Sequence, residues 1–291
     1  MRSIFLTGGS GFIGREVLRL LNEADDCVVT CLARRPEMLA AFRAVKVVSG
    51  DLLDPTTYSN AIPSGATVLH LAAATGNASP ATHWTVNVEG TRRLLEAGRK
   101  QNIDRIIFVS SIATTFRDQR YYHYAQAKAE AERLVRTSGL PYLIVRPTMV
   151  VGAGSPIQAA LRRLAGAPAM IVFGSGKAMV QPIHAGELAR CLVALCMSRS
   201  RHGIIEIGGP HRLPIEALIQ AYRRDIRGRV GPVIHVPTDP LRKILAVLEK
   251  VLPGRLPVTA GQLGMFVNDG CARANPLPET TAPAHESSST A

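Results

Sequence analysis

The sequence lacks the features that mark membrane-spanning and disulfide-stabilised proteins. Its 291 residues contain no uninterrupted apolar run of about 18 residues, which a conventional membrane-spanning helix requires. The apolar start becomes glycine-rich by Gly8, too early for a secretory signal peptide. The five cysteines are too few and too scattered for a disulfide scaffold, and no zinc-finger spacing follows Cys27 and Cys31. We therefore expect a cytoplasmic protein with reduced thiols, no metal site and no integral membrane segment.

Aromatic residues are scarce, at 5%, and acidic residues are outnumbered by basic ones, 22 against 34, for a net charge of +12. Such an excess of positive charge is common in proteins that bind nucleic acid. The basic residues are dispersed, however, and no aromatic-interleaved basic stripe accompanies them. We therefore expect no nucleic-acid partner, and a phosphorylated cofactor would account for part of the charge.

Short apolar runs alternate with longer amphipathic segments along the first half of the chain. The pattern predicts strands at 4–6, 27–33, 45–48, 67–71, 105–109 and 142–146, and helices at 11–21, 82–100 and 122–137. This alternation is typical of an α/β fold with a doubly wound parallel sheet, the Rossmann architecture. We expect a dinucleotide-binding core at 1–150, a smaller C-terminal substrate lobe interleaved with it at 151–274, and a disordered tail at 275–291.

One later segment, residues 240–252, has an apolar stripe at helical spacing. Its members are Leu241, Ile244, Leu245, Leu248, Val251 and Leu252. Such a helix packs on its own domain or on a partner subunit, or it makes a peripheral contact with a membrane surface. We favour packing on the helix's own domain or on a partner subunit, which is the commoner arrangement.

The first motif with chemical content is a glycine-rich turn between a predicted strand and a predicted helix. Gly8, Gly11 and Gly14 are spaced three apart, with Phe12 and Ile13 opening the helix. Glycine permits a tight turn and lets the backbone approach a pyrophosphate, while the helix N-terminus offers oriented amides. The motif therefore predicts dinucleotide binding at these five residues, although a tight turn without a ligand would use the same glycines.

The end of the second predicted strand favours NADP(H) over NAD(H). An NAD site usually places a carboxylate there for the ribose 2′-hydroxyl, whereas this strand is followed by Arg34 and Arg35. Asp25 and Asp26 precede the strand, so they lie at its amino end, away from the carboxyl end where the ribose would bind. Guanidinium groups suit a 2′-phosphate, although two solvated surface arginines are the alternative.

Asp51 follows the third predicted strand. A carboxylate at this place can accept from the adenine amino group of the cofactor. The alternative is a turn or helix-capping aspartate, which the sequence does not distinguish.

Tyr124 and Lys128 stand four residues apart and share one face of a predicted helix. An ammonium near a phenol favours the phenolate and lowers its pKa, which makes Tyr124 a candidate general acid or base. Ser110 and Ser111 end the fifth predicted strand, at the carboxyl edge where ligands bind in such sheets. A serine hydroxyl there can bond the same substrate oxygen, or it can simply cap local backbone.

These motifs together resemble the short-chain dehydrogenase/reductase superfamily, in its extended or atypical branch of epimerase, dehydratase and reductase relatives. The motifs that carry the resemblance are Thr7 to Gly14, Gly50-Asp51-Leu52, His70 to Ala73, Asn87 to Thr91, Val109-Ser110-Ser111, Tyr124 to Lys128, Arg146-Pro147 and Gln181 to His184. They cover about residues 1–190 in order and are specific for the fold more than for the reaction.

The resemblance implies a role for each matching residue. Ser111 matches the serine that orients the substrate oxygen, Tyr124 the catalytic acid or base, and Lys128 its pKa-lowering and ribose-binding partner. Asp51 and Leu52 match the adenine pocket, and Ala72 and Ala73 match the turn that lines the adenosine. Asn87 matches a helix asparagine that is structural more often than catalytic, and Arg34 matches the arginine of NADP-preferring relatives.

Two departures bear on the reaction. Only twelve residues separate Ser111 from Tyr124, a shorter connection than in sugar-nucleotide enzymes of the family. The family's Pro-Ile-His-Val-Asp-Asp pattern reads Pro-Ile-His-Ala-Gly-Glu at 182–187, with one acid lost. The first departure places a sugar-nucleotide substrate in doubt, and the second affects a structural contact.

The leading hypothesis is an NADP(H)-dependent oxidoreductase, of carbonyl reductase or alcohol dehydrogenase type, that acts on a small and partly apolar molecule. The substrate's character is suggested by apolar residues such as Leu161, Leu164, Ile171 and Val172, which are equally suited to an ordinary core. The alternatives are a sugar-nucleotide epimerase or dehydratase with an internally recycled cofactor, and a non-catalytic nucleotide-binding assembly factor or sensor. The helices at 82–100 and 122–138 could pair two copies into a homodimer.

Overall fold

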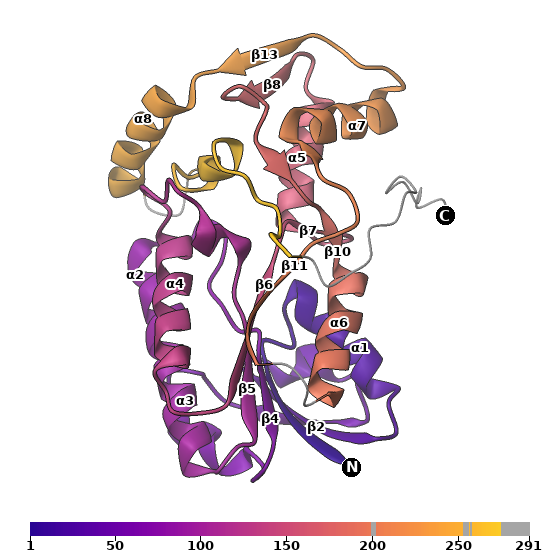
Figure 1. Ribbon diagram of the computed structural model, residues 1–291, viewed down its shortest axis with the longest axis vertical. Helices are drawn as coiled ribbons and strands as arrows, with labels where there is room; N and C mark the ends of the chain where they lie inside the picture. The colour runs from indigo at the N-terminus through magenta and orange to yellow at the C-terminus, as the bar shows by residue number, and fades with distance from the viewer. Residues whose placement is uncertain (199–201, 253–255, 257, 275–291) are drawn as a thin grey trace.

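A seven-stranded, wholly parallel sheet forms the lower part of the molecule in the computed structural model (Figure 1). The structure describes residues 1–198, 202–252, 256 and 258–274. The strand order is β11-β6-β5-β4-β1-β2-β3. The bounds are β1 (Arg2–Thr7), β2 (Cys27–Ala33), β3 (Val45–Ser49), β4 (Thr67–His70), β5 (Arg105–Val109), β6 (Tyr142–Pro147) and β11 (Gly203–Ile207). The predicted doubly wound α/β fold is confirmed.

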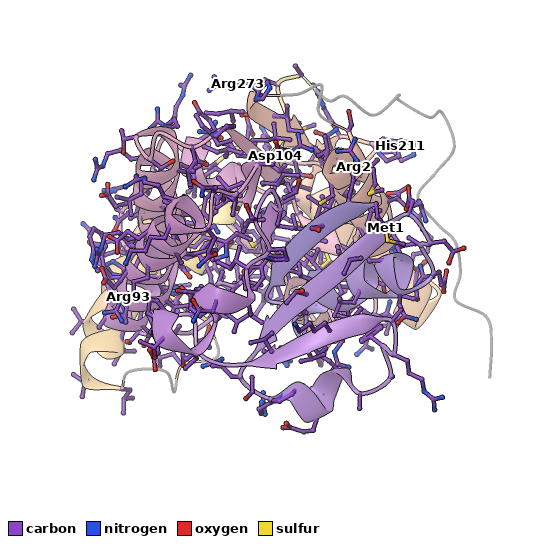
Figure 2. The ribbon with its side chains drawn as sticks, turned by 90° about the horizontal axis from the view of Figure 1, so that it is seen from below. Met1, Arg2, Arg93, Asp104, His211 and Arg273 are labelled. Atoms are coloured by element: carbon purple, nitrogen blue, oxygen red, sulfur yellow. The ribbon has the colours of Figure 1, made fainter. Side chains whose placement is uncertain are left out.

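Helices cover both faces of this sheet, because its central strands are apolar on both sides. On one face lie α1 (Phe12–Asn22) and α6 (Ala185–Met197), and on the other α3 (Gly90–Lys100) and α4 (His123–Arg136) (Figure 1). Short 3-10 turns connect the elements: η1 (Pro36–Leu39), η2 (Pro55–Thr57), η3 (Ser59–Ala61) and η5 (Ile112–Thr115). Figure 2 shows the amino end of the sheet, where Met1, Arg2 and Asp104 lie. The carboxyl ends of the strands face the other way, towards the second lobe.

The helix predicted at 82–100 is interrupted. It consists of α2 (Pro80–Trp84), a single π-helical turn, η4 (Thr85–Glu89), and then α3. Asn87 lies in the π turn and binds the backbone of Ala74 twice: its Oδ1 accepts from the Ala74 amide at 2.7 Å and its Nδ2 donates to the Ala74 carbonyl at 3.0 Å. The turn thus presents an asparagine that fixes the segment after β4, which is a structural role.

The C-terminal part of the chain divides between the two lobes. Residues of α6 and β11 return to the sheet, whereas the second lobe holds α5 (Pro156–Gly166), β8 (Met170–Phe173), α7 (Ile215–Arg227), β13 (Val233–Val236), α8 (Thr238–Val251) and η6 (Gln262–Phe266). Short two-residue strands join them: β7 (Val150–Val151), β9 (Met179–Val180), β10 (Ile183–His184) and β12 (Leu213–Pro214). Leu161 and Val172 are buried in the core of this lobe, while Ile171 is exposed. The tail predicted at 275–291 lies outside the described residues.

The helix predicted at 240–252 exists as α8, but it does not bury its whole apolar stripe. Leu241 and Leu245 pack against the core of the second lobe. Ile244, Leu248, Val251 and Leu252 are exposed, whereas Arg242 is buried. The helix's own domain therefore buries only part of the stripe, and packing of the exposed part on a partner subunit stays a prediction.

Two properties of the described residues complete the picture. No helix among residues 1–198 and 202–252 combines the length and the apolar character needed to cross a membrane. Within the part of the chain that the structure describes, no group of three or more histidine, cysteine or acidic side chains is placed to hold a metal ion, and the cysteines are free.

Candidate active site

The glycine turn joins β1 to α1, and its glycines pack directly against neighbouring backbone atoms. Gly8 has a positive φ of +79°, and a Cβ placed there would lie 2.5 Å from the amide nitrogen of Ala72. A Cβ on Gly14 would lie 2.1 Å from the Gly8 carbonyl oxygen. The turn is closed by a 3.0 Å hydrogen bond that the Gly11 amide donates to the same carbonyl. Only glycine fits at Gly8 and Gly14, which satisfies the steric requirement of a dinucleotide turn.

The first turn of α1 is available for a phosphate. Gly11 is the residue before the helix, and no described side chain caps it. Phe12 and Ile13 form the first turn and are half-buried. The amides of an uncapped helix N-terminus carry partial positive charge and can bind an anion. The residues present therefore fit the pyrophosphate of a dinucleotide.

Two pairs of residues predicted to hold the adenosine end follow β2 and β4, the strands on either side of β1. Arg34 and Arg35 follow β2 and are exposed. Ala72 and Ala73 follow β4 and are half-buried, and the Ala72 amide donates to the Thr7 hydroxyl at 3.3 Å. Because the carboxyl ends of parallel strands meet at one edge, these residues share the edge that carries the glycine turn.

Asp51 follows β3 and is engaged in its own turn. One carboxylate oxygen accepts from the Leu53 amide at 2.9 Å, and the Asp51 amide donates to the Thr57 hydroxyl at 3.2 Å. The adjacent Leu52 is buried against Gly90, the first residue of α3. The turn alternative for Asp51 is thus realised, and a role towards adenine stays a prediction.

Ser111 and Tyr124 come together from different elements. Ser111 lies two residues after the end of β5 and caps η5, because its hydroxyl accepts a hydrogen bond from the Ala113 amide at 3.2 Å. Tyr124 lies in the first turn of α4. Burial raises the pKa of Tyr124 to about 12, while a side-chain hydrogen bond with Ser111 acts in the lowering direction. The Tyr124 side chain therefore lies close to Ser111.

Lys128 lies one turn further along α4 and is buried. Its Nζ donates to the Val109 carbonyl of β5 at 2.7 Å and lies 4.1 Å from the centre of the Phe108 ring. Burial lowers the pKa of Lys128 to about 7, and the negative charge of Glu132 acts in the raising direction. The expected lowering of the Tyr124 pKa by this ammonium is wrong: burial raises that pKa, and the opposing effect comes from Ser111 rather than from Lys128.

A buried charge network behind the site was missed from the sequence. Glu132 accepts hydrogen bonds from Ser110 at 2.6 Å and from both Nε and Nη2 of Arg146, at 2.9 and 2.6 Å. Burial acts to raise the pKa of Glu132, but these hydrogen bonds outweigh it and the pKa is lowered. Glu132 stands four residues after Lys128, so it continues the helix face on which the tyrosine and lysine were found. That spacing was the available signal.

Two histidines near the site were also missed. The imidazole of His70 lies between the hydroxyls of Thr7, at 2.7 Å, and Thr91, at 3.0 Å. Burial, aided by the charge of Lys128, lowers the pKa of His70 to about 3. The ring of His83 in α2 lies edge-on to Tyr124, with 5.8 Å between centroids, and burial lowers its pKa. Both imidazoles are therefore neutral packing partners at neutral pH.

The short connection from Ser111 to Tyr124 is held by the second lobe. Asp118 lies in the middle of this connection, and its carboxylate accepts a hydrogen bond at 2.6 Å from the guanidinium of Arg242 in α8. The side chain of Asn268 binds the Asp118 backbone twice, accepting from its amide and donating to its carbonyl, both at 3.0 Å. The second lobe thus fixes the loop that delivers Tyr124 to the sheet edge.

A family model described as NAD(P)H-binding matches residues 8–162, more than half of the chain. The matched range includes the glycine turn, Ser111, Tyr124 and Lys128. The chain belongs to this NAD(P)H-binding family. The predicted resemblance to NAD(P)-dependent epimerase and dehydratase relatives is confirmed by this match together with the relatives below.

Curated relatives of this NAD(P)H-binding chain have the names of enzymes. A ceramide reductase of Caulobacter vibrioides is 30% identical over 211 residues, covering 72% of this chain and 65% of the relative. A 3 beta-hydroxysteroid dehydrogenase/Delta 5-->4-isomerase of Mycobacterium tuberculosis is 27% identical over 177 residues, covering 52% and 48%. A UDP-glucose 4-epimerase of Vibrio cholerae is 28% identical over 198 residues, covering 60% of each. The chain therefore spans about half to two thirds of the length of these relatives.

Solved structures share the fold. The Bordetella bronchiseptica enzyme WbmH in complex with NAD+ has a TM-score of 0.67 at 20% identity, covering 81% of this chain and 86% of that one. A UDP-glucose 4-epimerase of Thermus thermophilus in complex with NAD has a TM-score of 0.63 at 20% identity, with the same coverage of 81% and 86%. Likeness at this identity establishes the architecture, and the reaction has to be argued from the site.

Proposed function

We propose that the protein is an NADP(H)-dependent oxidoreductase that reduces a carbonyl group, or oxidises the corresponding alcohol, on a partly apolar molecule. The observation that carries the proposal is the pair of neighbouring hydroxyls, Ser111 and Tyr124, beside the carboxyl edge that holds the glycine turn. Two hydroxyl groups that can bond one substrate oxygen are suited to a carbonyl or an alcohol. The nicotinamide, when bound, exchanges a hydride with the substrate carbon.

The proton chemistry falls to Tyr124. With its pKa raised to about 12, the phenol is protonated at neutral pH and able to donate to an oxygen that becomes an alkoxide. Ser111 adds a second hydrogen bond to that oxygen, and both bonds strengthen as negative charge develops there. A protonated phenol is the form that can donate a proton to the substrate oxygen during reduction.

Lys128 acts as a positioning residue. Its ammonium is bonded to the carbonyl of Val109, the last residue of β5, so it ties α4 to the strand that leads to Ser111. A lysine has three donors, and those that remain are available to a ribose hydroxyl of the cofactor. The network of Glu132 and Arg146 behind it supports the same helix.

The apolar substrate class is supported by two relatives. They are named for ceramide and for a hydroxysteroid, and each of these is a lipid with an oxygenated carbon. Leu161 and Val172, which the sequence offered as signs of an apolar substrate, are buried in the core of the second lobe, so the support comes from the relatives alone. We therefore place an apolar ketone ahead of a nucleotide sugar as substrate.

A second candidate, favoured by the Vibrio cholerae relative, is a sugar-nucleotide epimerase that recycles its cofactor. The short connection after Ser111 is held by Asp118–Arg242 and Asn268, which leaves little freedom to enclose a nucleotide sugar. The two candidates differ in whether NADPH is consumed.

The deciding experiment gives the purified protein NADPH with a 3-ketosteroid or a long-chain aliphatic ketone and, separately, UDP-glucose with NADP+ or NAD+. We expect loss of the NADPH absorbance with an apolar ketone and no conversion of UDP-glucose. Conversion of UDP-glucose to its epimer without net reduction of the oxidised cofactor would establish the second candidate instead. Binding of neither NADPH nor NADH would contradict both.

A further inference from the structure

We propose that the outer face of the second lobe binds peripherally to an anionic lipid membrane, with α8 lying on the lipid surface. The first observation that supports this inference is the set of exposed apolar side chains on α8. Ile244, Val247, Leu248 and Val251 are 57, 61, 39 and 71% exposed. Their spacing places them on one side of the helix, the arrangement of a helix that lies in a membrane interface.

The orientation of α8 is fixed from its other side. Arg242, which points away from the exposed residues, is 1% exposed, and its guanidinium donates to Asp118 at 2.6 Å and to the Arg120 carbonyl at 2.6 Å. It also donates to the Ala260 carbonyl at 3.2 Å. The helix therefore cannot rotate to bury its apolar side without leaving a buried guanidinium unpaired, which is strongly unfavourable.

The exposed apolar surface continues beyond α8. Strand β13 leads into α8, and its Ile234, 50% exposed, is the register partner of Ile171 in β8, 36% exposed. Ile226 and Val230, at and just after the end of α7, are 40 and 53% exposed. Figure 1 shows α7, β8, β13 and α8 together at the end of the molecule remote from the sheet. A surface of this kind on several neighbouring elements indicates an interaction site.

Charge identifies lipid as the occupant. Residues 215–252 contain seven basic and four acidic side chains. Of the basic ones, Arg223 and Arg242 are buried, whereas Arg224, Arg227, Arg229 and Lys243 are exposed. Exposed acids also occur here, Asp225 and Asp239, the latter 3.7 Å from Arg120. A second copy would bring the same net charge of +12 against this face, whereas anionic headgroups neutralise basic side chains around inserted aliphatic ones.

The face that meets the membrane is connected to the site. Asp118 and Arg120, which hold the buried side of α8, belong to the connection between Ser111 and Tyr124. Membrane binding would therefore place the proposed reaction beside a source of apolar substrate, a consequence that rests on the proposed function. The binding itself does not depend on the reaction.

The test is co-sedimentation of the full chain with vesicles of phosphatidylcholine alone or of equimolar phosphatidylcholine and phosphatidylglycerol. We expect the anionic vesicles to bind about tenfold more strongly. The double variant Val247→Glu/Val251→Glu should lose about tenfold or more of that binding, because charge replaces the inserted side chains. The control Val28→Glu changes an aliphatic residue of 47% exposure in β2 and should leave binding unchanged.

Vesicle binding by the wild-type protein at high salt tests the proposal without relying on the folding of a variant. Part of the binding should persist in about 1 M salt, where the Debye length is about 3 Å and only apolar insertion remains effective. Complete loss in salt together with unchanged binding of the double variant would show adsorption by charge alone and overturn the proposal. So would absence of binding to anionic vesicles, or a concentration-dependent dimer that the double variant abolishes. Vesicle binding needs no cofactor, so its failure leaves the proposed reaction untouched.

Discussion

At the residue scale, the site depends on how burial and hydrogen bonding set the protonation of neighbouring groups. Tyr124 and Lys128 share a helix face as predicted, yet burial drives their pKa values in the direction of the neutral form in both cases, up for the phenol and down for the ammonium. The sequence could identify the pair by its spacing, but burial depends on contacts from other elements, so the sign of the Tyr124 shift could not be predicted.

Cofactor selectivity is a residue-scale prediction. Arg34→Glu should weaken NADPH binding about 10- to 100-fold, because it removes a charge-assisted contact to the 2′-phosphate and adds a repulsive charge. NADH binding should change little. Fluorescence titration of both cofactors checks this, and equal effects on both would show that Arg34 does not lie at the 2′ position.

The glycine turn allows a matched pair of substitutions. Gly14→Ala should destabilise the protein by about 1–3 kcal/mol and weaken NADPH binding, because the new methyl would overlap the Gly8 carbonyl. Gly166→Ala, at a helical position with no neighbour within 4 Å of the new Cβ, should be tolerated. Urea unfolding measures both, and similar behaviour of the two variants would refute the steric argument.

At the element scale, strands and helices with strong local patterns were predictable and those defined by tertiary contacts were not. Six strands of the sheet were predicted from short apolar runs, whereas β11 is part of a glycine-rich segment far along the chain and was missed. The π turn at Asn87 depends on a bond to Ala74 on another element. The orientation of α8 depends on Arg242 finding Asp118, a pairing across 124 residues that no local periodicity reports.

That pairing gives an element-scale prediction. Asp118→Ala should destabilise the protein by about 1–3 kcal/mol, because it leaves the buried Arg242 guanidinium short of an acceptor. Asp239→Ala removes an exposed carboxylate from α8, the helix that carries Arg242. It should lower the free energy of unfolding by no more than about 0.5 kcal/mol. Chemical denaturation compares them, and equal losses would mean that the Asp118–Arg242 contact does not anchor α8.

At the scale of the whole molecule, a buried neutral histidine links stability to pH. His70 has a folded pKa of about 3, below its ordinary value of 6.5. Between these values the unfolded chain binds a proton that the folded chain excludes, so the free energy of unfolding falls as pH falls below 6.5. The slope from this one group is about 1.4 kcal/mol per pH unit.

The His70→Asn variant isolates that contribution. It should be less stable at pH 7, where two hydrogen bonds of His70 are altered, but its stability should decline less steeply between pH 6.5 and 5. Urea unfolding over this range measures the two slopes. Parallel curves would show that His70 does not titrate on unfolding.

The architecture of the whole chain was the part most open to sequence reasoning. The alternation of strands and helices and the glycine turn predicted the doubly wound sheet, because both follow from local chain geometry. The joint role of Ser111 and Tyr124 in the site stays a prediction. The charge network of Glu132 and Arg146 could not be predicted, because it depends on how α4 faces β6. Pairing of two copies through the helices at 82–100 and 122–138 stays a prediction.

The central claim is that Tyr124 serves chemistry rather than cofactor binding, and Tyr124→Phe tests it most directly. The variant keeps the aromatic ring beside His83 and removes only the hydroxyl. We predict NADPH binding within about twofold of wild type and a loss of ketone reduction of about 10²–10⁴-fold, the range for a general acid. Undiminished reduction by this variant, or a wild-type protein that binds neither NADPH nor NADH, would contradict the account.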